Sequence, residues 1–239
     1  MKMKRCAVLL LALAWLLLAT AGSAMALDLT LNAASASWAS VSGGPDNIIG
    51  LNTEEVRWGT PADTQQAGLR FDAVGTPTSI STDAAFSLGI LTHFNFPTTG
   101  NPATGAALAL DLTVTDGGIF NEIFNFDFAI DETPNAEPCP DWQVSGTPCD
   151  DRITFPSAQS SEMFTIDGID YTLLLLGFGP TADSLQDSFI TEEGLASRAT
   201  LWGELDSTGG PGDVPEPAAL LLIGTGLLGL AGFRRKFSK

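Results

Sequence analysis

Basic side chains are almost absent from most of this sequence. Between Leu27 and Asp213 there is no lysine, and four arginines stand against 27 acidic residues, which gives this stretch a net charge of −23. The other seven basic residues lie in the first five and last six positions of the chain. Because a nucleic-acid-binding surface needs cations to neutralise phosphates, we exclude nucleic acid as a partner.

Histidine is equally scarce, and this limits the chemistry that the chain could perform. His93 is the single histidine, and no Gly-x-Ser-x-Gly sequence is present to supply a serine nucleophile for a triad. Paired carboxylates could hydrolyse glycosides without a histidine, but among so many acids some pair reaches catalytic spacing by chance. We therefore expect a non-enzymatic protein, in which His93 fixes a turn through side-chain hydrogen bonds.

Residues 1–26 have the three parts of a secretory signal peptide. Three basic residues occupy the first five positions, an apolar run follows at 7–19, and small residues precede a cut at Leu27. The apolar run is short for a membrane span. These features predict export through the Sec translocon, and the alternative is an uncleaved N-terminal anchor.

Cysteine is also rare. Removal of the signal peptide takes Cys6 and leaves Cys139 and Cys149 as the only thiols. An even pair of cysteines in an oxidising compartment favours a disulfide. It would close an 11-residue loop, for which the chain-entropy contribution is roughly 2.5–3 kcal/mol. A zinc site is the competing interpretation, but it lacks a second cysteine pair and has one histidine to draw on.

Apolar and polar residues alternate through the middle of the chain, as in half-buried β-strands. The pattern is clearest at residues 108–114 and 120–130, whereas residues 171–176 are apolar on both faces and are expected to lie centrally in a sheet. Glycine and proline clusters separate these segments. We expect residues 27–208 to form an all-β domain, an antiparallel β-sandwich of jelly-roll type; two smaller sheets divided near 133–156 are the alternative.

A composite signal closes the chain. Residues 209–213 form a Gly-rich linker, 218–233 form a short apolar stretch, and 234–239 form a basic stop. As a transmembrane helix, 16 residues reach about 24 Å, short of the roughly 30 Å hydrocarbon core. The basic stop should stay in the cytoplasm, which places the domain outside. Between linker and helix lies the motif Val214, Pro215, Glu216 and Pro217, and the stop-transfer residues are Arg234, Arg235 and Lys236.

This tripartite tail resembles a PEP-CTERM sorting domain. The resemblance implies recognition by an exosortase, a membrane transpeptidase of Gram-negative bacteria that make exopolysaccharide. It implies transient insertion in the inner membrane, cleavage near Pro217, and delivery of the mature protein to the cell surface or extracellular matrix. The alternative is an ordinary single-pass membrane anchor.

Internal segments resemble the THxN family of PEP-CTERM proteins. Thr92, His93 and Asn95, with Phe94 between them, carry the motif that names the family, and 128–135 resembles its Glu-Thr-Pro-Asn segment ahead of a cysteine loop. Three further segments are similar in kind: 149–156, 164–178 and 193–203. The resemblance implies surface sorting and a shared β-rich domain, and it implies no catalysed reaction.

Calcium is a candidate ligand of the exported domain, because hard carboxylate oxygens suit Ca²⁺. The candidate ligands are close in sequence, and the Cys139–Cys149 bridge would hold some of them together, although the chain has no Asp-x-Asp-x-Asp-Gly loop. These candidates are Asp131, Asp141, Asp150 and Asp151.

An alternative function is a carbohydrate-binding module of the exopolysaccharide matrix, with or without calcium. Such modules stack sugars on exposed aromatic rings, and Trp142 in the predicted disulfide loop is the candidate. Trp38, Trp58 and Trp202 are expected to pack in the core or at its rim. Loss of sugar binding without loss of stability in Trp142→Ala would distinguish this alternative from a structural role.

Overall fold

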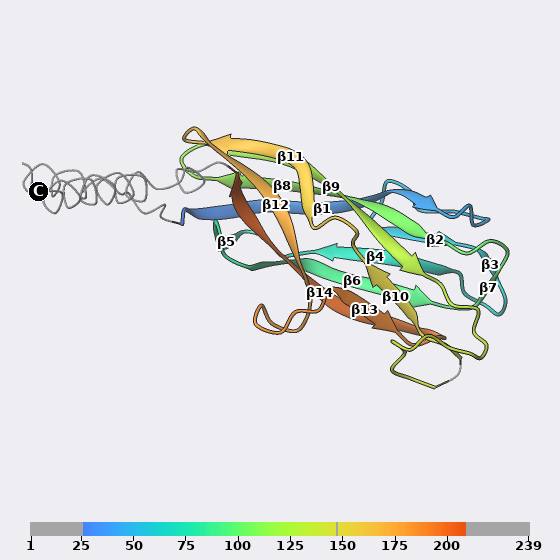
Figure 1. The fold of residues 1–239 in the computed structure, drawn as a ribbon. Helices are drawn as coiled ribbons and strands as arrows, with labels where there is room; N and C mark the ends of the chain where they lie inside the picture. The colour runs from blue at the N-terminus through green and yellow to red at the C-terminus, as the bar shows by residue number, and fades with distance from the viewer. Residues whose placement is uncertain (1–25, 147, 209–239) are drawn as a thin grey trace, which may run out of the picture. The chain divides into compact units, whose positions relative to one another are not determined.

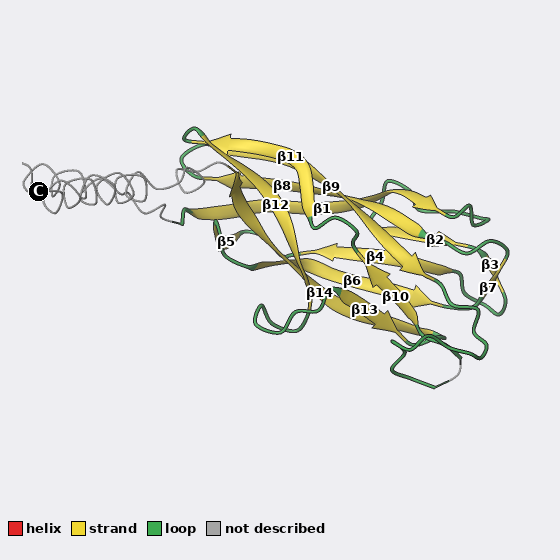
Figure 2. Ribbon diagram, viewed as in Figure 1, coloured by secondary structure: helices red, strands yellow, loops and turns green. Residues whose placement is uncertain are grey.

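The computed structural model describes residues 26–146 and 148–208. Every regular element in this part of the chain is a β-strand, and none of it is a helix that could cross a membrane (Figure 2). All the strand pairs are antiparallel, so the expected all-β antiparallel fold is confirmed. The expected signal peptide (apart from Ala26), the linker 209–213 and the tail 214–239 lie outside the described residues.

The strands run in chain order as follows: β1 (Asp28–Ser42), β2 (Glu55–Trp58), β3 (Thr60–Pro61), β4 (Ala67–Ala73), β5 (Thr78–Ser81), β6 (Phe86–Asn95), β7 (Thr98–Thr99), β8 (Gly105–Thr115), β9 (Ile119–Asp131), β10 (Asp151–Thr154), β11 (Gln159–Ile166), β12 (Ile169–Phe178), β13 (Ser188–Thr191) and β14 (Leu195–Thr208).

Two six-stranded sheets and one small ribbon result from this pairing (Figure 1). The first sheet has the order β13-β10-β9-β8-β1-β5, the second has the order β11-β12-β14-β6-β4-β2, and β3 pairs with β7. The loop 132–150 joins β9 to β10, which pair directly in the first sheet. It therefore connects neighbouring strands and does not separate two smaller sheets.

The alternating segments of the sequence supply the core. In β8 and β9 every second side chain is buried along most of each strand, as the period of two predicts. The segment 171–176 lies in β12, which has a neighbour on each side, β11 and β14. The expectation that it lies inside a sheet is confirmed.

Aromatic rings join the two sheets across one hydrophobic core. Phe128 of β9 lies tilted against Phe178 of β12 in the other sheet, with ring centroids 6.4 Å apart, and edge-on to Trp38 of β1 in its own sheet at 6.0 Å. Phe124 of β9 meets Phe164 of β11 at 6.1 Å. Edge-on and tilted pairs of this kind add to the free energy of burial.

The chain enters and leaves this domain at one end. The backbone N–H of Thr82 donates to the carbonyl oxygen of Leu27, and that of Asp83 donates to the carbonyl oxygen of Leu205, both at 2.9 Å. The turn after β5 thus joins the first and last strands' ends within the described domain. From Leu195 to this end β14 runs for 14 residues, roughly 40–45 Å at about 3.3 Å per residue. The opposite end of the strands carries the site described next.

Candidate functional site

The inward side chains of the Thr-His-x-Asn motif reach from β6 to the other sheet. The Nδ1 atom of His93 lies 2.7 Å from the hydroxyl oxygen of Thr191 on β13. The side-chain amide of Asn95 donates to the carbonyl oxygen of Thr191 at 3.1 Å. Since β6 and β13 belong to different sheets, these contacts form a polar clasp between them. We call His93, Asn95 and Thr191 the clasp.

His93 does not fix a turn, contrary to the expectation from the sequence. It lies within β6, paired with Leu69 of β4 on one side and Ser197 of β14 on the other. The two-residue period of a strand puts Leu91, His93 and Asn95 on the same face, so the motif continues an apolar stripe with polar groups. Burial lowers the pKa of His93 to about 3, which keeps the imidazole neutral.

Thr92 has the opposite orientation on the strand and is not part of the clasp. It is buried, and its hydroxyl oxygen has no hydrogen-bond partner among the described residues. Of the three motif positions, two therefore reach the neighbouring sheet and one does not.

A cavity of about 360 Å³ lies at the end of the domain away from Leu27. Its lining includes Phe96 and Glu193, which closely follow the clasp residues Asn95 and Thr191 in the sequence. Its apolar wall includes Phe96 and Pro97, which directly follow β6. Its polar wall includes Glu132 and Asn135, which follow β9, and Glu193, which lies between β13 and β14. Three segments that are far apart in sequence meet in this cavity.

These segments are the ones that carry the resemblance noted in the sequence. The Thr-His-x-Asn motif leads into Phe96, the Glu-Thr-Pro-Asn segment is residues 132–135, and the segment 193–203 begins with Glu193. Their convergence on one cavity makes it the candidate functional site, since ligand sites are concave and combine apolar walls with a few polar groups.

Three carboxyl groups with raised pKa values line or adjoin the cavity. Burial, then repulsion from Glu132, raises the pKa of Asp151 to about 8, although its carboxylate accepts a 2.8 Å hydrogen bond from the backbone of Thr133. Burial raises the pKa of Glu193 to about 7. Burial also raises the pKa of Glu132, against the opposing 3.4 Å hydrogen bond from Trp58. The charged groups that shift these pKa values belong to the same three residues: Glu132 and Glu193 act on Asp151, and Glu132 acts on Glu193.

The cavity wall also contains buried acceptor atoms that have no donor. The Oε1 atom of Glu193 and the Oδ1 atom of Asn135 are buried without a hydrogen-bond partner among the described residues. A buried polar atom left unpaired costs about 1–3 kcal/mol. The wall therefore combines acceptor atoms that no donor of the described residues satisfies with carboxyl groups that burial keeps partly protonated near pH 7.

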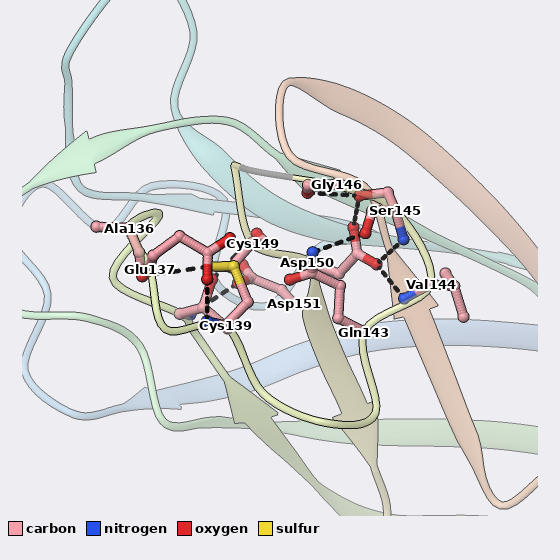
Figure 3. The surroundings of a disulfide bond; sticks show 11 residues. Ala136, Glu137, Cys139, Gln143, Val144, Ser145, Gly146, Cys149, Asp150 and Asp151 are labelled. Atoms are coloured by element: carbon pink, nitrogen blue, oxygen red, sulfur yellow. Dashed lines mark hydrogen bonds between the residues drawn. A yellow bond between two sulfur atoms is a disulfide. The ribbon is translucent and has the colours of Figure 1, made fainter.

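The predicted disulfide is present and encloses a loop with its own polar centre (Figure 3). Cys139 and Cys149 are joined at 2.00 Å. The carboxylate of Asp150 accepts hydrogen bonds from the backbone of Val144 at 2.8 Å and of Ser145 at 2.9 Å, and from the Ser145 hydroxyl. Burial acts to raise the pKa of Asp150, but these hydrogen bonds outweigh it and leave the pKa below its ordinary value.

The four calcium candidates are distributed over separate environments. Asp131 pairs with Arg152 at 2.6 Å, Asp150 binds the loop amides, Asp151 adjoins the cavity, and Asp141 is exposed. In the part of the chain that the structure describes, no three acidic, histidine or cysteine side chains form a group that could hold a metal ion. Calcium binding stays a prediction.

Trp142 is half-buried at the surface of the disulfide loop. The guanidinium carbon of Arg152 lies 4.7 Å from the centre of its ring, a cation–π contact. Trp38 and Trp58 are fully buried, and Trp202 is half-buried with its ring N–H bonded to the carbonyl oxygen of Gly179. Of the four tryptophans in the domain, Trp142 is thus the one that reaches the surface on a loop.

Sequence reasoning missed Thr191, Asn135 and Glu193 as individual site residues. Asn135 and Glu193 belong to segments that were singled out by resemblance, so that signal could have found them. Thr191 has no local signal, because its partner His93 is 98 residues away in sequence.

Comparison with known proteins identifies the tail. Residues 213–236 match the PEP-CTERM protein-sorting motif, so the expected sorting motif is confirmed. A tail of this kind indicates an exported protein that is an exosortase substrate and is anchored through its C-terminal region. No curated protein matches the chain. The motif residues 214–217 and the stop-transfer residues 234–236 lie outside the described part of the chain.

Proposed function

We propose that this chain is a non-enzymatic protein of the cell surface or extracellular matrix, sorted by an exosortase in an exopolysaccharide-producing Gram-negative bacterium. The observation that carries the proposal is the matched sorting motif at residues 213–236. It begins five residues after β14 ends at Thr208, so the domain and the tail are joined by a short connection.

The domain itself is the cargo in this proposal. We interpret the two sheets and their common core as an antiparallel β-sandwich of jelly-roll type, and the chain as a member of the THxN family. The convergence of the family-like segments around one cavity supports this interpretation. Within the domain, the cavity lies at the end of β14 away from Thr208, the last described residue.

Mass spectrometry of the protein extracted from an exosortase-positive host tests the proposal. We expect cleavage near Pro217 and no peptides from 218–239 in the mature form. The same protein from an exosortase-deleted host is the control, and it should retain its C-terminus. A peptide ending at Lys239 in most of the mature protein would contradict the proposal and identify an ordinary membrane anchor.

A carbohydrate-binding module of the matrix is the second candidate function. It is favoured by one observation, the half-buried ring of Trp142 at the surface of the disulfide loop. The ring is already in contact with Arg152 on one face, so a sugar would have to use the other face or displace the guanidinium. The Trp142 variants in the Discussion separate the two candidates.

A further inference from the structure

We propose that the cavity walled by Phe96, Glu132, Asn135 and Glu193 binds a small organic molecule through a protonated amine. The proposal concerns the described domain and does not depend on the sorting of the tail. Three features of the cavity carry it: its size, two buried acceptor atoms without a donor, and a group of carboxyls on which no cationic side chain of the described residues acts.

The size of the cavity suits an organic molecule. About 360 Å³ is available, within the range of roughly 300–1,000 Å³ in which proteins bind small ligands. The wall combines the ring of Phe96 and the side chain of Pro97 with five polar side chains, those of Thr98, Glu132, Thr133, Asn135 and Glu193. A ligand that occupies it therefore needs an apolar body and a polar group.

The unpaired atoms of the wall determine whether the polar group of the ligand donates or accepts hydrogen bonds. The Oδ1 atom of Asn135 accepts hydrogen bonds, as does the Oε1 atom of Glu193 when that carboxyl is ionised, and both atoms are buried without a partner in the described structure. The side chain of Asn135 donates a hydrogen bond to the Glu193 carboxyl, which lowers its pKa against the larger effect of burial. The ligand must donate, and an ammonium group offers three donors from one atom.

The charge of the site specifies the sign of that group. When ionised, Glu132, Asp151 and Glu193 repel one another, and within residues 26–146 and 148–208 no cationic side chain acts on any of them. The domain has no lysine. Three of its four arginines pair elsewhere: Arg57 with Glu55, Arg70 with Asp72 and Arg152 with Asp131. Burial without a counter-charge keeps these carboxyls partly protonated, and a ligand that brings its own positive charge stabilises their ionised form.

An organic cation fits this arrangement better than a metal ion. Among residues 26–146 and 148–208 no three acidic, histidine or cysteine side chains converge as metal ligands do. A metal ion would also leave most of the cavity and its apolar wall without contact. The ring of Phe96 in that wall can in turn stabilise an ammonium group through its π face.

Isothermal titration of the full chain, purified in detergent, tests the proposal with two probes of equal size. The probes are trans-4-aminocyclohexanol and trans-cyclohexane-1,4-diol, which differ in one ammonium group and one hydroxyl. We expect the amine to bind at least about tenfold more tightly than the diol. Equal binding of the two, or no binding of the amine, would overturn the proposal.

Two matched variants locate the site. Glu193→Gln removes the charge at the cavity and should weaken amine binding about tenfold, whereas Glu192→Gln changes an exposed neighbour and should leave it unchanged. Equal losses in both variants would show non-specific attraction to an acidic surface and contradict the proposal. Displacement of the amine by an equimolar amount of CaCl₂ would also contradict it, because the site would then be a metal site.

The pH dependence of binding supplies a readout that does not require a mutation. Glu132, Asp151 and Glu193 are the titratable groups that act on one another here, and burial keeps their pKa values high. An aliphatic amine keeps its proton to about pH 10. Amine affinity should therefore rise between pH 6 and pH 8.5, and a flat or falling profile would contradict the proposal.

Discussion

The Nδ1 atom of His93 lies 2.7 Å from the hydroxyl oxygen of Thr191, and this one contact joins strands of two different sheets. The Thr191 hydroxyl also lies 3.4 Å from the carbonyl oxygen of Asp151, to which it can donate. Through this hydroxyl the clasp, which joins β6 to β13, also contacts β10. A buried hydrogen bond has a preferred direction, so it restricts the sliding of one sheet over the other. An apolar contact restricts this sliding less.

Removal of the clasp should destabilise the domain. We expect His93→Ala to lower the free energy of unfolding by about 3 kcal/mol, because it leaves a cavity in the core and removes the partner of the Thr191 hydroxyl. In a double-mutant cycle with Thr191→Val, the two effects should fall short of additivity by about 1 kcal/mol. Urea denaturation of the four proteins measures both quantities.

The exposed hydrogen bond between Asn32 and Thr115 is the matched control for this cycle. It also joins two side chains from different strands, at 2.8 Å, but it lies at the surface. A cycle of Asn32→Ala and Thr115→Val should give a coupling below about 0.5 kcal/mol. If the clasp shows no more coupling than this pair, its role in joining the sheets is refuted.

Removal of the disulfide should affect both stability and the cavity. In the double variant Cys139→Ser with Cys149→Ala we expect the free energy of unfolding to fall by roughly 2.5–3 kcal/mol, from the entropy of the opened loop. The carbonyl oxygen of Cys149 accepts a 3.1 Å hydrogen bond from the hydroxyl of Thr133, which lines the cavity. Amine binding should therefore weaken as well. Unchanged binding in a folded double variant would show that the loop does not shape the cavity.

The stability of the domain should fall as the pH rises from 6.5 to 8.5. Asp151 and Glu193 have folded pKa values of about 8 and about 7, above their ordinary values of 3.8 and 4.5. In this range the folded state keeps protons that the unfolded state has lost, so raising the pH favours unfolding, by about 1–2 kcal/mol in total. His93 acts weakly in the opposite direction: it is neutral in the folded state, and in the unfolded state it loses its remaining charge just above pH 6.5, which favours folding by about 0.4 kcal/mol.

Thermal denaturation across this range measures the effect. Asp151→Asn is the control, because an amide mimics the protonated carboxyl and cannot ionise, so most of the dependence should disappear. A melting temperature that rises between pH 6.5 and pH 8.5 in the unmodified protein would contradict the raised pKa values.

Substitution of Trp142 should act on stability and not on sugar binding. We expect Trp142→Ala to lower the free energy of unfolding by about 1 kcal/mol, since it removes the cation–π contact with Arg152. Retention by purified exopolysaccharide, measured per folded molecule, should be unchanged. Loss of retention at full stability would instead support the carbohydrate-binding function. Arg152→Met is the matched variant, and it should reproduce the loss of stability.

Changes in the tail should block processing and leave the domain unaffected. We expect replacement of Glu216 by alanine to cause accumulation of an uncleaved precursor in an exosortase-positive host, because the motif directs recognition. Glu204→Ala in the domain is the control, and it should be processed normally. Immunoblotting against a tag placed after Lys239 measures both. Normal processing of the Glu216 variant would show that recognition does not read this residue.

The sequence alone was sufficient for several features that depend on nearby residues, although it did not place His93 within a strand. The alternation in 108–114 and 120–130 predicts strands because the side chains of a strand change face at every residue. The tail is recognisable because an exosortase motif, an apolar stretch and a basic stop follow one another directly. The disulfide was predictable because Cys139 and Cys149 are the only two cysteines of the exported part.

The clasp and the cavity depend on the tertiary structure. Nothing near Thr191 in the sequence predicts that it meets His93, and the calcium hypothesis grouped acids that the fold assigns to separate environments. Glu132 and Glu193 share a cavity because β9 and β13 both flank β10 and end at the same edge of the domain. The local sequence pattern sets which face of a strand is buried. The pairing of distant strands decides which polar groups are buried together. It therefore also decides the charge and pKa of these groups and their capacity to bind a ligand.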